Sequence, residues 1–245
     1  MKFGVKSDKG IQRDSNEDSY NIIAGYPNVP VCFIIADGMG GHNSGEVASK
    51  MAVDSISNYI LEFPDDLSDE TRVEERIQDA IINANTEIFE ISKLKPETAG
   101  MGTTLILAVV CNKKIYIGHV GDSRVYLLRD GNFEQITTDH SFIEELVKTG
   151  SITRLEAQGH PKRNLITRAL GCLEKVESDL YDCNIKDNDV YLLCTDGLTN
   201  MLDDEKIKEI LENTDDPQQA CNTLVDAANA AGGEDNVSVI IFRNQ

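Results

Sequence analysis

The sequence predicts an α+β fold in which helices cover two antiparallel β-sheets. Short apolar runs rich in Val, Ile and Tyr recur along the chain, as is typical of buried strands. Some are separated by only three or four residues, in connections that contain Asn112–Lys114 and Asp122–Arg124, and connections this short join antiparallel neighbours. Two long segments with apolar residues at helical spacing divide the early strands from the later ones, and helices there would bury the outer faces of the sheets.

The strands are predicted where four or more β-branched, aromatic or aliphatic residues stand together between turn residues. Two weaker candidates near the N-terminus have polar residues among the apolar ones. In chain order, the predicted strands are Phe3–Lys6, Ser19–Ile23, Val31–Ala36, Thr103–Cys111, Ile115–Val120, Val125–Leu128, Val190–Cys194 and Val237–Phe242.

The helices are predicted from apolar residues that recur every three to four positions. Asn43, with Glu46 three residues later, would cap the first helix. The first helix would bury Ala48, Met51, Ala52, Ser55, Ile56, Tyr59 and Ile60, and the second Val73, Ile77, Ala80, Ile81, Ala84, Ile88 and Ile91. Later helices are expected around Phe142–Lys148, Asp203–Leu211 and Pro217–Ala231.

Composition limits the class of protein. The 245 residues contain 42 Asp plus Glu against 23 Lys plus Arg, a formal charge of −19. This excess argues against binding nucleic acid or an anionic membrane, both of which require basic surfaces. No repeat or linker interrupts the chain, so we expect a single domain over residues 1–245 and a monomer. The longest apolar run, Leu105–Cys111, is too short to span a bilayer, and the N-terminus lacks a signal peptide, so we expect a cytoplasmic protein.

Aspartates stand where several predicted strands begin or end. Asp37, Asp122 and Asp196 follow strands and have a glycine beside them, and Asp235 precedes the last strand. If these strand ends converge, the site offers several carboxylates without a Cys or His cluster, which suits Mg²⁺, Mn²⁺ or Ca²⁺ rather than zinc. Asp and Gly are also common turn residues, and spacing alone does not decide between the two interpretations.

Arg13 lies five positions before Asp18 in the segment ahead of the second strand candidate. Beside a metal cluster, an arginine would bind a phosphate through two hydrogen bonds; in isolation this segment is a solvated turn. Other phosphate chemistries lack their motifs. No Cys has an Arg six positions later, as a cysteine phosphatase requires, and no G-x-x-x-x-G-K-[ST] loop is present.

These residues resemble the metal-dependent protein phosphatases, the type-2C serine/threonine (PPM) family, in its compact bacterial form. The resemblance extends over nearly the whole chain and keeps the order of the family's motifs. The matching blocks are Arg13, Asn16–Asp18, Ala36–His42, Gly45–Glu46, Gly102–Thr104, Gly118–Arg124, Asp139–Ser141, Arg168–Gly171, Cys194–Leu198 and Gly233–Asn236.

The resemblance implies a four-layer α-β-β-α sandwich with two Mn²⁺ or Mg²⁺ ions at one edge of the sheets and a weaker third ion. Asp37 and the water that bridges the metals would be central to catalysis, and Arg13 would hold the substrate phosphate. The metal-binding residues would be Asp37, the Gly38 carbonyl, Asp196 and Asp235, with Asp18 acting through water and Asp122 sharing the third ion with Asp196.

The same resemblance implies hydrolysis of phosphoserine and phosphothreonine in proteins by the metal-bridging hydroxide, opposing a bacterial serine/threonine kinase. Residues 139–168 would form the family's flap beside the cleft. Some relatives use a histidine after Asp-Gly as the general acid. Here Met39 takes that position, and we do not transfer the role to His42.

Two other functions remain open on sequence alone. A catalytically silent relative could act as a binding module, although such proteins typically lose a metal-binding aspartate and all are present here. A partner-switching phosphatase of stress signalling is the other alternative. Those proteins usually carry sensor domains and lack the block around Arg13.

Overall fold

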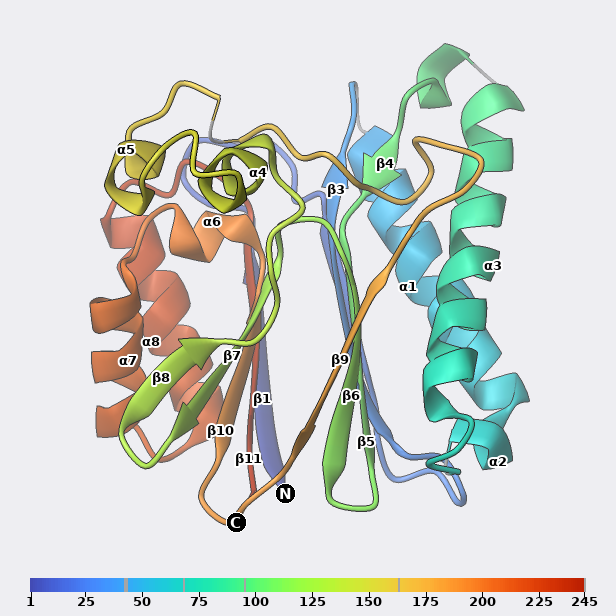
Figure 1. The fold of residues 1–245 in the computed structure, drawn as a ribbon, viewed down its shortest axis with the longest axis horizontal. Helices are drawn as coiled ribbons and strands as arrows, with labels where there is room; N and C mark the ends of the chain where they lie inside the picture. The colour runs from blue at the N-terminus through green and yellow to red at the C-terminus, as the bar shows by residue number, and fades with distance from the viewer. Residues whose placement is uncertain (42–43, 68, 95, 163, 245) are drawn as a thin grey trace.

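The computed structural model describes residues 1–41, 44–67, 69–94, 96–162 and 164–244. Two antiparallel sheets face each other at the centre of the molecule, and helices cover both outer faces (Figure 1). The predicted α+β class and the α-β-β-α layering are therefore confirmed.

The first sheet has the strand order β1-β11-β10-β7-β8. Its last strand in sequence, β11, lies between β1 and β10 and pairs antiparallel with both. The strands are β1 (Lys2–Asp8), β11 (Val237–Arg243), β10 (Val190–Cys194), β7 (Arg124–Arg129) and β8 (Asn132–Gln135).

The second sheet has the order β2-β3-β5-β6-β9, and the short β4 pairs with the end of β3. Its strands are β2 (Asp18–Ile23), β3 (Val31–Met39), β4 (Gly102–Thr103), β5 (Leu105–Cys111), β6 (Lys114–Val120) and β9 (Asp179–Asn184). The predicted strand over residues 103–111 is interrupted at Thr104, whose side chain and backbone bind Asp37 instead of continuing the ladder.

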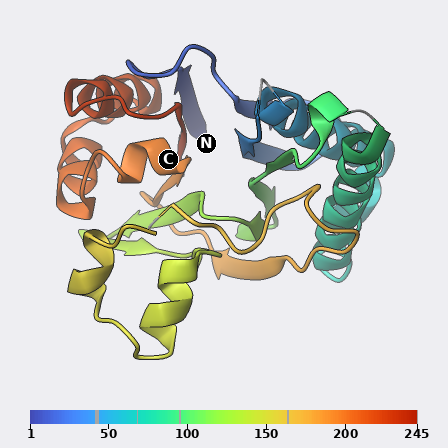
Figure 2. The same cartoon turned by 90° about the horizontal axis from the view of Figure 1, so that it is seen from above.

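The helices form two outer layers and a separate flap. Seen from above, α4 and α5 project away from the two layers beside one edge of the sheets (Figure 2). The helices are α1 (Ser44–Glu62), α2 (Pro64–Leu67), α3 (Val73–Leu94), the 3₁₀ turn η1 (Pro96–Thr98), α4 (Phe142–Lys148), α5 (Arg154–Gln158), α6 (Asp196–Thr199), α7 (Asp204–Asn213) and α8 (Pro217–Ala230).

Three hydrophobic clusters hold the layers together. One lies between α1, α3 and the second sheet and contains residues such as Ile56 and Ile81. Another lies between α7, α8 and the first sheet. The third fills the space between the sheets. There the Phe242 ring stacks between those of Phe33 and Tyr191, with ring centroids 4.7 Å and 4.6 Å away. Strands buried on both faces read as continuous apolar runs, which explains why β5 and β10 were predicted most readily.

Several details differ from the sequence predictions. Strands β8 and β9 were not predicted, because β9 is a half-exposed edge strand with two aspartates and β8 is a mostly exposed four-residue strand. Ile91, predicted to face the core, is 36% exposed, because the buried face of α3 moves on to Ser92 at the end of the helix. The predicted capping residue Asn43 and the neighbouring His42 lie outside the described residues. Within the described chain, no helix combines the length and the apolar character needed to cross a membrane.

Candidate active site

The pairing of β2 with β3 brings the first two aspartates of the predicted site together. Asp18 is the first residue of β2, and its direct antiparallel partner is Asp37. Asp37 lies inside β3, two residues before its end, and not after the strand as predicted. Its backbone N–H donates to Thr104 Oγ1 (2.9 Å) and its carbonyl accepts from the Thr104 N–H (2.9 Å). These bonds fix the backbone from which the Asp37 carboxyl projects.

Asp18 is a buried carboxyl group with only one oxygen satisfied. Its Oδ2 accepts hydrogen bonds from Ser238 Oγ (2.7 Å) and Thr195 Oγ1 (3.0 Å), whereas its buried Oδ1 has no hydrogen-bond partner among the described residues. Burial, followed by the charges of Asp196 and Asp235, raises the pKa of Asp18 to about 7. A buried oxygen left unpaired in this way is suited to accept a water molecule or a cation's hydration shell.

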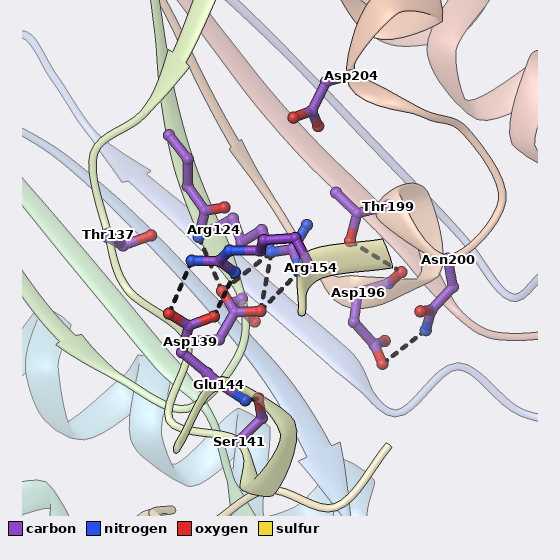
Figure 3. A network of polar contacts seen from close by, with 12 residues as sticks. Arg124, Thr137, Asp139, Ser141, Glu144, Arg154, Asp196, Thr199, Asn200 and Asp204 are labelled. Carbon is purple, nitrogen blue, oxygen red and sulfur yellow. Dashed lines mark hydrogen bonds and ion pairs between the residues drawn. The ribbon is translucent and has the colours of Figure 1, made fainter. Parts of the chain in front are cut away.

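Asp196 and Asp235 come from the two central strands of the other sheet. Asp196 follows β10 and opens α6, and Asp235 stands just before β11. Because β10 and β11 are antiparallel neighbours, the end of one strand and the start of the other lie at the same edge. Asp196 Oδ2 accepts from Asn200 Nδ2 at 2.9 Å, as Figure 3 shows. Burial, followed by the charge of Asp235, raises the pKa of Asp196.

The five predicted carboxylates act on one another. Burial raises the pKa of Asp37 well above its usual value, and the charges of Asp18, Asp196, Asp122 and Asp235 raise it further. Burial, followed by Asp196 and Asp139, raises the pKa of Asp122 to about 8. The structure therefore brings all five aspartates into a single cluster at one edge of the two sheets.

Arg13 reaches the same cluster from the loop between β1 and β2. Its Nη2 lies 2.7 Å from Asp235 Oδ2, and its Nε donates to the Glu234 carbonyl (3.3 Å), while half of the side chain stays exposed. The loop is held in place by the amide of Asn236, which donates to the carbonyl groups of Lys9 (2.9 Å) and Ser15 (2.8 Å). Arg13 is thus an accessible cation on a fixed loop beside the carboxylates.

Gly38 allows the backbone of β3 to pass very close to the start of α1. A Cβ atom at this position would lie 2.1 Å from the Gly45 carbonyl oxygen and 2.6 Å from the Glu17 carbonyl oxygen. Gly197, beside Asp196, is equally confined, because a Cβ there would lie 2.0 Å from the Asn236 carbonyl oxygen. These glycines are required by close approach of backbone segments at the site.

A half-buried ion pair next to the cluster had no role in the sequence prediction. Arg124 binds the Asp139 carboxylate through Nε (3.0 Å) and Nη2 (2.7 Å) (Figure 3). Its Nη1 donates to the Tyr126 hydroxyl (3.1 Å). Its charge lowers the pKa of both Asp122 and Asp196, against the larger effect of burial. Both residues stood in the matching blocks of sequence, but nothing in the spacing indicated that they pair.

The donor atoms fit divalent cations. The described residues of the site offer carboxylate oxygens and no thiol. The negative charges of neighbouring carboxylates raise the pKa of Asp37, and one buried Asp18 oxygen has no partner among the described residues. Hard divalent cations prefer such oxygen ligands. Among the described residues, however, no group of three His, Cys, Asp or Glu side chains is arranged to hold an ion as it stands. Asp235 and Asp196 instead bind Arg13 and Asn200.

Comparison with known proteins identifies the family of the chain. The family model described as "Protein phosphatase 2C" matches residues 10–228. The serine/threonine phosphatase stp of Listeria monocytogenes is 39% identical over 241 residues, covering 98% of this chain and 95% of the relative.

Solved structures show the same similarity. The crystal structure of serine/threonine phosphatase Stp1 from Staphylococcus aureus has a TM-score of 0.92 and 35% identity, covering 99% of this chain and 94% of that one. The catalytic domain of the phosphatase PstP, solved in complex with two manganese ions, has a TM-score of 0.84 and 36% identity, with 98% and 96% covered. By its sequence, its fold and its cluster of aspartates, this chain belongs to the protein phosphatase 2C family.

Proposed function

We propose that this protein removes phosphate from phosphoserine and phosphothreonine residues of other proteins in a reaction that requires divalent metal ions. The observation that carries the proposal is the convergence of five aspartates and one accessible arginine at a single edge of the sandwich. The similarity to phosphatases named as serine/threonine-specific, and to one solved with two manganese ions, supports the same function.

The residues divide into metal-binding and phosphate-binding groups. Asp37, the Gly38 carbonyl, Asp196 and Asp235 would hold two Mn²⁺ or Mg²⁺ ions. Asp18 would act through water, since its free oxygen is buried beside the cluster. When bound, the ions supply positive charge that polarises the phosphate and lowers the pKa of water to near neutrality.

Arg13 would bind the phosphate group of the substrate. Its guanidinium now satisfies Asp235, and half of its side chain faces solvent, so it can turn to a phosphate without crossing the core. Two parallel N–H donors match two phosphate oxygens, which orients the phosphorus and stabilises charge on its equatorial oxygens. The buried aspartates cannot play this part, because they would repel the phosphate until cations neutralise them.

The proposal extends to the substrates, the location and the oligomeric state of the protein. The substrates would be phosphoproteins made by a serine/threonine kinase, and the protein would act as a cytoplasmic monomer without binding nucleic acid or membrane. The charge of −19 supports the last point. A third, weaker ion would lie between Asp122 and Asp196, since the charge of Asp196 raises the pKa of Asp122.

The test is hydrolysis of a phosphothreonine peptide by the purified full chain, with Mn²⁺, with Mg²⁺ and after removal of all divalent ions. We expect activity only with metal, and we expect Asp37→Asn to lower kcat by at least about 100-fold, the scale of losing one electrostatic contributor. Asp54→Asn, at an exposed position on α1, is the matched control. Full activity without metal, or in Asp37→Asn, would refute the proposal. Comparing phosphoproteomes of cells with the wild type and with Asp37→Asn would then identify substrates.

A further inference from the structure

Two buried histidines enclose the turn that carries Asp122. His119 is the penultimate residue of β6, and His140 stands at the start of the flap, residues 139–168. Their ring centroids are 4.8 Å apart, and both side chains are almost fully buried. The His140 ring contacts Gly121 and the His119 ring contacts Ser123, so Asp122 is the residue between the two contacts. Neither histidine has a part in the function proposed above.

His119 holds the residue after Asp122. Its Nε2 lies 2.8 Å from the Ser123 carbonyl oxygen, which can only accept, so the ring proton is on Nε2. Burial lowers the pKa of His119 to about 4, so the ring is neutral and Nδ1 carries no proton. Nδ1 is buried, and no residue in the described part of the chain is its hydrogen-bond partner. The ring therefore makes one directional bond, to the Asp122 turn.

His140 holds the residue before Asp122 through two bonds. Its Nδ1 accepts from the Gly121 N–H (3.1 Å), and its own backbone N–H donates to the Gly121 carbonyl (2.8 Å). Because an amide N–H can only donate, Nδ1 carries no proton, and in the neutral ring Nε2 is the donor. Nε2 lies 3.2 Å from Asp179 Oδ2 on β9.

His140 is also the base of the flap. The Thr167 N–H donates to its carbonyl (2.7 Å), and the next pair along, the Phe142 N–H to the Leu165 carbonyl (2.8 Å), joins the two sides of the flap. Arg168 follows directly and donates to Asp179 Oδ1 at 2.8 Å. Both ends of the flap therefore meet at the residue whose ring binds the Asp122 turn.

We propose that His119 and His140 are positioning residues that fix the Asp122 carboxylate for cation binding, and that His140 joins the flap to this carboxylate. The proposal rests on the phosphatase function and on Asp122 holding an ion. The two ring nitrogens of His140 have separate effects: Nδ1 orients the turn, and Nε2 connects the ring to Asp179 and to Arg168 at the end of the flap, whose Nη1 also lies 3.2 Å from Nε2. Partners that orient metal ligands typically change metal affinity 10- to 100-fold when they are removed.

The two effects can be separated with His140→Asn and His140→Ala. An asparagine places its Oδ1 near the position of Nδ1 and can accept from the Gly121 N–H, but it has no atom at the position of Nε2. An alanine loses both contacts. His119→Gln likewise keeps a donor near Nε2, whereas His119→Ala loses it. Asp179→Ala removes the flap contact from the other side and leaves the histidine in place.

Each variant is stripped of metal and titrated with Mn²⁺ by calorimetry in the full chain, with Asp122→Asn identifying the binding step that depends on Asp122. We expect His140→Ala and His119→Ala to weaken this step by about 10-fold or more, and His140→Asn and His119→Gln to keep it within about 2-fold. On a phosphothreonine peptide, His140→Asn and Asp179→Ala should share a changed KM. Circular dichroism tests the folding of each variant.

Several results would overturn the proposal: an Asp122-dependent step that both alanine variants leave unchanged, a His140→Asn variant as weak as His140→Ala, or a wild type without such a step. If the alanine variants do not fold, His140→Asn alone tests the proposal. An Asp122-dependent Mn²⁺ affinity that is about 10-fold weaker in this variant contradicts the assigned role of Nδ1. An unchanged affinity together with an altered KM supports that role. The phosphatase function itself fails differently, through a wild type that binds Mn²⁺ and hydrolyses no phosphopeptide.

Discussion

The buried carboxyl of Asp18 leads to a prediction that reverses the usual effect of changing an active-site residue. Without metal, the unfolding free energy of Asp18→Asn minus that of the wild type should be more positive at alkaline pH than at acidic pH. The amide keeps an oxygen that can accept from Ser238 and Thr195, and it cannot ionise. It also places an NH₂ group where Oδ1 is buried without a partner, which costs about 1–3 kcal/mol at every pH.

The magnitude follows from the shift in pKa. Asp18 titrates at about 7 in the folded chain and near 3.9 when unfolded. Because the folded state holds this proton to higher pH, the contribution of Asp18 to wild-type stability falls as pH rises from about 4 to about 7 and is level above that. Between pH 5 and pH 8 this one group costs the wild type about 3 kcal/mol, at about 1.4 kcal/mol for each pH unit up to 7. The asparagine variant does not carry that cost.

The assay is urea unfolding of both proteins at pH 5 and pH 8 with a chelator present. The difference in unfolding free energy, variant minus wild type, should be about 3 kcal/mol more positive at pH 8 than at pH 5. Asp54→Asn, at an exposed position on α1, should give the same difference at both values. Saturating Mn²⁺ should remove the advantage of Asp18→Asn, since cations supply the missing positive charge. An equal effect of Asp18→Asn at both pH values without metal would refute the reasoning.

Two further predictions concern phosphate binding and packing. Arg13→Ala should lower kcat/KM on a phosphothreonine peptide by about 10- to 100-fold, the scale of losing hydrogen bonds to a charged group, with Arg13→Lys between it and the wild type; an unchanged kcat/KM in steady-state kinetics would contradict the role of Arg13. Gly38→Ala should lower the unfolding free energy by at least about 2 kcal/mol, because its Cβ would meet the Gly45 carbonyl oxygen at 2.1 Å. Gly159→Ala, where a Cβ has nothing within 4 Å, is the control, and similar melting temperatures for the two variants would count against the close approach.

Elements with a strong apolar pattern could be predicted from the sequence. The predicted bounds of Val190–Cys194 and Phe142–Lys148 are those of β10 and α4, because one is an uninterrupted buried run and the other begins after the capping residue Ser141. Strand β9 could not be predicted, since all of its residues are half-buried or exposed at the edge of a sheet. Its place is set by pairing with β6, a tertiary contact with no local signal.

The residue types of the site could be predicted from the sequence, but their convergence at one edge of the sheets could not. Asp-Gly pairs at strand ends suggested a metal-binding chemistry, yet only the pairing of β2 with β3 and of β10 with β11 brings those ends to one edge. The hydroxyl groups around the carboxylates could not be identified either. Thr104, Thr195 and Ser238 are ordinary strand or loop residues in sequence, and their roles depend on which backbone comes to lie beside them.

The position of β11 has a consequence for the order in which the protein matures on the ribosome. This strand is made last among those described, yet it lies between β1 and β10, and Asp235 stands two residues before its first residue. A nascent chain that has reached only residue 230 has every other aspartate of the cluster but cannot complete the first sheet. It also lacks Asn236, which fixes the loop carrying Arg13. Hydrolytic activity therefore requires β11, so a chain that stops before this strand should not dephosphorylate other proteins.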